Sequence, residues 1–196
     1  MCSDAGDDPQ TIDFHKVVNR FIEELKKKSD DAVSAYAKKP RKRWTELATQ
    51  ALVQAGHALF GLHLEHASRT TKSSWGRSEH LTVDAMVYEK GRGPIRFIAE
   101  HENAPSLDPL KTQCWKLAHI RADVRVLVGY YRRPRRRPSS DSCRDFDTGK
   151  AQLHKVAERV HSGPIILILG DLDAKSKKPE DFETIYRAAQ IGVVNP

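Results

Sequence analysis

Two stretches of alternating apolar and polar residues, separated by the sequence GRGP at 91–94, constrain the fold of this chain more than any other feature. In residues 81–88 every second residue from Leu81 to Val87 is apolar, which is the period of a β-strand with one buried face. Residues 95–102 alternate in the same way, and the glycines and proline between the two stretches favour a turn. The pattern predicts a β-hairpin.

Helical periodicity and short apolar runs surround this hairpin and predict the rest of the fold. Together they indicate an α/β protein whose mixed central β-sheet is flanked by helices, with an N-terminal helical extension. The expected helices are 12–28 with Thr11 as N-cap, a short one to about residue 37, one starting near Trp44, 110–121, one around 151–160, and a last helix at 182–189. The expected further strands are 61–67, 124–131 and 164–169.

The length of 196 residues suits one domain with such an extension. Residues 1–43 are interpreted as an acidic leader and helical extension that ends in a polar connector at 38–43, and residues 44–196 as the α/β domain, with its core at 44–131. The three cysteines show no C-x-x-C spacing, and no apolar signal segment or membrane-length run occurs. These features favour a cytoplasmic protein.

Charge favours a polyanionic partner. Lysine and arginine number 33 against 26 acidic residues, for a net charge of +7 and a pI near 9.4. Solvated surface lysines alone also give a positive net charge. Charge therefore leaves two alternatives equally open, a protein that binds nucleic acid and a protein with no polyanionic partner. The sequence contains no P-loop, no nucleophile-elbow motif and no H-E-x-x-H motif, and nucleotide-dependent, serine-hydrolase and histidine-zinc chemistry therefore have no support.

Three carboxylates fall on the two strands of the expected hairpin. Glu100 and Glu102 are two residues apart and point to the same side of their strand, and Asp84 is out of phase with the apolar residues of the partner strand. We expect all three on the face turned away from the main apolar stripe, where Mg²⁺ would neutralise them. The alternative is an ordinary solvent-exposed face of a half-buried sheet.

Asp84 followed by Glu100-His101-Glu102, in an order of helix, hairpin, helix and strand, resembles the core of the PD-(D/E)XK nuclease superfamily, whose fold is restriction-endonuclease-like. The resemblance covers about residues 44–131. It implies that Asp84 and Glu100 bind Mg²⁺ (or Mn²⁺) and that the backbone carbonyl of His101 is a further ligand. Glu46, at the start of the preceding helix, would be an added acid for a second metal ion, or an acid placed favourably at a helix N-terminus.

The chain departs from the usual motif at Glu102, where the superfamily places a lysine. Some restriction endonucleases of this fold carry Glu-x-Glu there, so Glu102 remains a candidate catalytic residue. Lys116, on the following helix, is expected to reach back and fill the role of the lysine, with Lys111 as a less favoured candidate. The alternative for both is an ordinary solvated helix lysine.

The resemblance implies a metal-dependent hydrolase of phosphodiester bonds in DNA, an endonuclease rather than an exonuclease. A catalytically inactive nucleic-acid-binding module of the same fold is the alternative, because the motif lacks its lysine. An arginine-rich loop after the strand at 124–131 is expected to bind the phosphate backbone, or else to be a solvated charge run; it contains Arg132, Arg133, Arg135, Arg136 and Arg137. A homodimer is left open.

Overall fold

The computed structural model describes residues 13–38, 41–61, 65–68, 83–91, 93–133, 142–160 and 163–192. Its helices are α1 (Phe14–Lys27), α2 (Ser29–Lys38), α3 (Arg41–Phe60), α4 (Leu107–Ala118), α5 (Phe146–Glu158) and the short α6 (Phe182–Ile185), which follows the 3₁₀ turn η1 (Pro179–Asp181). Its strands are β1 (Glu65–Ser68), β2 (Ala85–Tyr88), β3 (Ile95–His101), β4 (Val124–Tyr131), β5 (Ile165–Asp171) and β6 (Tyr186–Ile191).

The strands form one mixed sheet in the order β1-β2-β3-β4-β5-β6. Neighbours are antiparallel from β1 to β3, parallel from β3 to β5, and antiparallel again between β5 and β6. In the predicted hairpin Ala85 lies opposite Ala99, and the register shifts between Val87 and Tyr88. The expected mixed sheet flanked by helices is confirmed.

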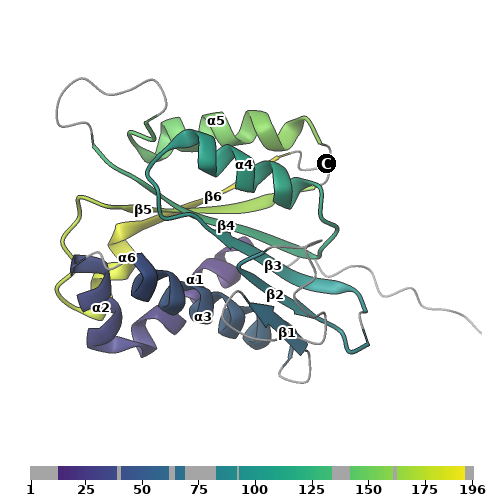
Figure 1. Ribbon diagram of the computed structural model, residues 1–196, viewed down its shortest axis with the longest axis horizontal. Coiled ribbons are helices and arrows are strands. Elements are labelled where there is room, and N and C mark those ends of the chain that lie inside the picture. Colours follow the sequence, from purple (N-terminus) through teal and green to yellow (C-terminus); the bar gives the residue numbers. More distant parts are fainter. Residues whose placement is uncertain are drawn as a thin grey trace, which may run out of the picture.

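Helices cover both faces of the sheet (Figure 1), so the molecule has two apolar layers. Helices α1, α2, α3 and α6 cover one face, where Leu52 and Phe97 are fully buried. Helices α4 and α5 cover the other face, where Ile98, Leu110 and Leu127 are fully buried. Burial on both faces explains why the central strands β4 and β5 are nearly continuous apolar runs rather than alternating ones.

The predicted N-terminal helical extension packs into the first of these layers. Phe21 of α1 is fully buried and meets Tyr186 edge to face, with ring centroids 5.7 Å apart. Asp13, rather than the predicted Thr11, is the N-cap of α1, and its carboxylate accepts a hydrogen bond of 2.9 Å from the amide of His15. The helices before α3 therefore share one core with the sheet.

Three expected boundaries were wrong. The last predicted helix ends at Ile185, and residues 186–191 instead form β6, which pairs with β5 and places Ile191 opposite Ile165. Helix α4 begins and ends three residues earlier than expected, and residues 41–43 of the expected polar connector belong to α3. Pairing with a neighbouring strand outweighed the helix propensity of the alanines near the C-terminal end of the fold.

None of the helices in the described ranges is long and apolar enough to cross a membrane.

Candidate active site

The hairpin brings two of the predicted acids together. Asp84 directly precedes β2, and the register that pairs Ala85 with Ala99 places Asp84 opposite Glu100. The two side chains interact, and Asp84 Oδ2 also accepts a hydrogen bond of 2.9 Å from the amide of His101. Asp84 and Glu100 are 5% and 2% exposed, so both carboxyl groups are withdrawn from bulk water.

Lys116 completes this group from α4. Its Nζ lies 2.5 Å from Oε1 of Glu100, and its side chain is 27% exposed against 3% for that of Glu100. The lysine therefore connects the buried acid to the surface. Lys111, the less favoured candidate, lies 3.8 Å from Asp108 of its own helix.

Burial dominates the electrostatics of Glu100. The pKa of the carboxyl is raised from 4.5 to about 8, chiefly by burial and also by the neighbouring Asp84, and Lys116 opposes both effects. A cation placed beside Asp84 and Glu100 would favour the ionised form of both acids.

The acids share a face with apolar residues, which differs from expectation. Residues in phase with Asp84 and Glu100 include Met86 and Ile98, both buried under α4. The sheet has no solvent-exposed polar face at this point, because α4 and α5 cover it. The reading of these two acids as an ordinary solvated surface is therefore wrong.

Glu102 lies beyond the end of β3, and its carboxylate contacts the backbone two residues further along the chain. Its amide donates to the carbonyl of Val128 at 2.9 Å, and its Oε1 accepts from the amide of Ala104 at 2.8 Å. This side chain stabilises the bend that follows the strand.

Glu46 lies on α3, which covers the face of the sheet opposite to α4. Its carboxylate pairs with Arg43 at 3.3 Å. The first turn of α3 nevertheless lies close to the end of β3, because Asn103 donates a hydrogen bond from Nδ2 to Oγ1 of Thr45. Across the described ranges, no three side chains of histidine, cysteine or acidic residues are grouped closely enough to hold a metal ion.

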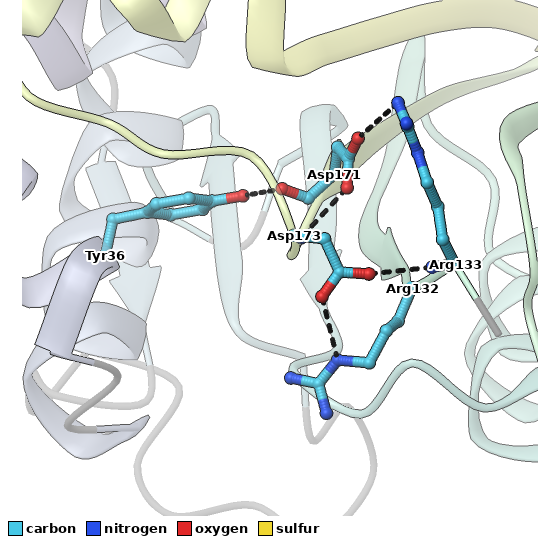
Figure 2. A network of polar contacts seen from close by, with 5 residues as sticks. All are labelled: Tyr36, Arg132, Arg133, Asp171 and Asp173. Carbon is cyan, nitrogen blue, oxygen red and sulfur yellow. Dashed lines mark hydrogen bonds and ion pairs between the residues drawn. The ribbon is translucent and has the colours of Figure 1, made fainter. Parts of the chain in front are cut away.

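Two acids hold the start of the predicted arginine loop (Figure 2). Asp173 Oδ2 accepts from the amide of Arg133 at 2.9 Å, and Asp171 Oδ2 lies 3.4 Å from Nη2 of the same arginine. Arg132 Nε lies 3.8 Å from Oδ1 of Asp173. Arg132 and Arg133 are thus partly neutralised, while the remaining loop positions predicted to bind phosphate, Arg135, Arg136 and Arg137, lie outside the described residues.

A buried aromatic network on the other face of β3 was not predicted. His101 Nε2 lies 2.8 Å from the hydroxyl of Tyr130, which also accepts from Nε1 of Trp44 at 2.5 Å and lies 3.2 Å from the hydroxyl of Tyr186. Burial lowers the pKa of His101 to about 4, so its ring is neutral. No sequence motif links these four residues. By contrast, Asp171 ends the buried strand β5 and Asp173 lies two residues beyond it, and acids at the carboxyl end of a buried strand are a signal that the sequence itself shows.

A pocket of about 160 Å³ opens beside this network. Asn103, Arg132 and Leu172 line it within two residues of the carboxyl ends of β3, β4 and β5, which lie at one edge of the sheet because these strands are parallel. Residues from α2, from the start of α3 and from the loop after β3 complete it, namely Ala35, Tyr36, Trp44 and Pro105.

No protein-family model, curated protein sequence or solved structure matches this chain.

The chemistry of the acid pair fits a hard divalent cation. Mg²⁺ commonly takes only one or two protein carboxylates, together with waters and substrate phosphates, and Asp84 and Glu100 would supply those carboxylates. Burial, with Asp84 nearby, keeps the pKa of Glu100 raised even with Lys116 in contact, and a cation at the pair would lower it. The amide of His101 contacts Asp84, and the role of its carbonyl as a metal ligand stays a prediction.

Proposed function

We propose that this protein is a divalent-metal-dependent nuclease that hydrolyses phosphodiester bonds in DNA. The observation that carries the proposal is the buried group of Asp84, Glu100 and Lys116, in which two neighbouring strands and a helix bring two carboxylates and one ammonium together. The order α3-β1-β2-β3-α4-β4 around that group supports the resemblance to the PD-(D/E)XK core.

Asp84 and Glu100 would hold Mg²⁺ or Mn²⁺. When bound, the ion supplies Lewis-acid stabilisation of negative charge on the phosphate and acidifies water at the site. The hydrogen bond from the His101 amide orients Asp84 toward this position. Burial under α4 excludes bulk water from the two acids and strengthens their attraction for a cation.

Lys116 is the residue we assign to the role of the lysine missing from the motif. Its ammonium contacts Glu100, yet its side chain remains partly exposed and can meet a phosphate oxygen or a water that arrives from the surface. Three N–H groups allow it to contact Glu100 and a second acceptor at the same time. Glu102 is the weaker candidate for this role, because its carboxylate already accepts a hydrogen bond from the amide of Ala104.

A nucleic-acid-binding module without catalysis is the second candidate. The contact between Lys116 and Glu100 favours it, because an ammonium already supplies part of the positive charge that a metal ion would provide. The two functions make the same prediction for binding and opposite predictions for cleavage.

Cleavage by the purified protein decides between them. Plasmid, linear duplex and single-stranded DNA, with RNA in parallel, are incubated with Mg²⁺, Mn²⁺ or EDTA. We expect metal-dependent cleavage of DNA that disappears in Asp84→Ala and persists in Asp147→Ala, which removes an exposed acid of α5. DNA binding without cleavage under all metal conditions would establish the binding module instead, and cleavage of RNA alone would overturn the choice of DNA.

A further inference from the structure

The pocket at the carboxyl ends of β3, β4 and β5, called here the aromatic pocket, has two aromatic walls. The rings of Tyr36 and Trp44 are 5.2 Å apart between centroids and inclined by 77°. Their polar ends already have protein partners, because the Tyr36 hydroxyl donates to the carbonyl of Asp171 at 2.6 Å and the indole N–H of Trp44 donates to Tyr130. Both residues are largely buried, 3% exposed for Tyr36 and 5% for Trp44, so what they present to a ligand is the small part of the ring surface that lines the pocket.

Two polar residues face the same pocket. Asn103 uses its amide nitrogen to bond Thr45, so its carbonyl oxygen remains as an acceptor for a ligand. Arg132 is the one charged residue among those that line the pocket in the described part of the chain. Its Nε is 3.8 Å from Asp173, a distance at which the guanidinium keeps donors for another anion.

Size limits the ligand to one ring system. The pocket measures about 160 Å³, and an apolar cavity of about 150 Å³ holds a single benzene molecule. Complete small-molecule ligands occupy pockets of roughly 300–1,000 Å³. A planar ring with a hydrogen-bond donor on its edge fits, and an anionic group attached to it would stay outside, beside Arg132.

The aromatic pocket is connected to the acid pair in two ways, by the sequence at the end of β3 and by a path of hydrogen bonds. Asn103 directly follows Glu102 at the end of β3. Trp44 is joined through Tyr130 to His101, whose amide bonds Asp84. The acid pair and the aromatic pocket thus lie on opposite faces of the sheet and are connected through His101 at the end of β3.

We propose that the aromatic pocket binds one nucleobase of a nucleotide, with the adjacent phosphate at Arg132. In its strongest form this inference rests on the proposed function, because the nucleotide then belongs to the strand that is cut at Asp84 and Glu100. Stacking on aromatic side chains is tolerant of base identity, so the pocket anchors the strand without reading its sequence.

Fluorescence of Trp44 tests the pocket directly. The double variant Trp75→Phe, Trp115→Phe leaves Trp44 as the single tryptophan, since the chain has three. It is titrated, with Ca²⁺ in place of Mg²⁺, with the four nucleoside 5′-monophosphates, with ribose 5-phosphate and with a short single-stranded DNA. We expect quenching by nucleotides and by DNA but not by ribose 5-phosphate.

Two further measurements separate the base from the phosphate. An abasic nucleotide moved along the DNA should weaken binding about tenfold at one position, as expected for the loss of one stacked base. Leu172→Phe, which fills the pocket, should abolish the difference between abasic and intact DNA. Arg132→Ala should weaken binding of nucleotides but not of nucleosides, whereas Arg144→Ala, an exposed arginine outside the pocket, should match the parent protein.

The outcomes separate this inference from the nuclease proposal. Intact metal-dependent cleavage, with no quenching by nucleotides and no sensitive abasic position, would overturn the pocket and leave the nuclease standing. Quenching by mononucleotides that Leu172→Phe removes, in a protein that cuts nothing, would support the pocket as a site for free nucleotides and overturn the nuclease. If Leu172→Phe fails to fold, the abasic scan and Arg132→Ala decide alone.

Discussion

At the scale of single residues, Glu100 is the position where stability and activity should conflict. Burial makes its charged form costly, as its raised pKa shows. We expect Glu100→Gln to abolish metal-dependent cleavage and to raise the melting temperature by about 2–4 °C, the change that ~1 kcal/mol produces in a chain of this size. Lys116 can turn its ammonium to solvent once the acid is gone.

Calorimetry measures the melting temperature of Glu100→Gln, and a plasmid-cleavage assay on the same sample measures its activity. Asp147→Asn, which changes an exposed acid, is the control. A variant that is more stable and still cuts would remove Glu100 from the catalytic residues.

Lys116 and Glu102 can be compared in the same way. If Lys116 fills the role of the missing lysine, Lys116→Ala should lower the rate at saturating Mg²⁺ by ~10²–10⁴, the usual contribution of a proton-transfer or water-orienting group. Glu102→Gln should stay close to wild type, because Oε1 accepts a backbone hydrogen bond that glutamine can keep.

The measurement is a Mg²⁺ titration of initial rates. A metal ligand changes the concentration of Mg²⁺ required, whereas a water-orienting lysine changes the saturated rate. A large loss in Glu102→Gln with little loss in Lys116→Ala would reverse the two assignments.

At the scale of elements, a histidine pair connects the edge strand β1 to α3. Nε2 of His57 lies 3.1 Å from Nδ1 of His66, and burial together with His57 lowers the pKa of His66 below its usual 6.5. Below that pH the unfolded chain binds a proton that the folded chain does not. The contribution of neutral His66 to the free energy of unfolding is therefore fully present above about pH 6.5 and is lost as the pH falls.

We expect wild-type protein to lose more stability between pH 7.5 and pH 5 than His66→Gln, which cannot titrate. His119→Gln, which changes an exposed histidine of α4, should follow the wild type. Urea unfolding at both pH values provides the test, and parallel losses in all three proteins would show that the pair has no part in acid sensitivity.

The elements also show which features sequence reasoning can reach. The hairpin and the pairing of Asp84 with Glu100 followed from alternation, because a period of two assigns every residue of a strand to a face. The burial of both faces did not follow, since it depends on α4 and α5 packing over the acids. The strand β6 was missed because its pairing with β5 is a long-range contact that local propensity does not encode.

Residues that act through long-range contacts were likewise beyond prediction. The aromatic network depends on Trp44 and Tyr130 meeting across 86 positions of sequence, and no local pattern indicates such a meeting. Lys116 was a candidate only because the resemblance to the PD-(D/E)XK superfamily implies that a lysine of the following helix can fill the role of the missing one.

At the scale of the whole molecule, a net charge of +7 would favour the proposed binding of DNA, and two acids oppose the charge of the arginines nearest to them. Asp171 and Asp173 contact Arg133 and Arg132 at the base of the arginine loop. We expect Asp173→Asn to tighten DNA binding and to steepen its salt dependence, by ~0.9 in log-log slope for each additional phosphate of duplex DNA that an arginine neutralises.

Replacing all five arginines of the loop by alanine should make the salt dependence of DNA binding less steep. These residues are Arg132, Arg133, Arg135, Arg136 and Arg137. Fluorescence anisotropy across a salt series measures both variants. Equal slopes in the wild type and in the five-alanine variant would exclude the loop from the DNA interface.

The contact of α1 with the end of the fold also has a consequence for synthesis. Phe21 packs on Tyr186, and Lys26 pairs with Glu183 at 2.6 Å, so the first described helix is held by nearly the last described elements. The acids and the lysine have all been translated by residue 116, yet the layer beneath them closes only when β6 has left the ribosome. Under the proposed function, a nascent chain would carry Asp84, Glu100 and Lys116 before the fold around them is complete, and cleavage would begin only after translation has passed the last strand.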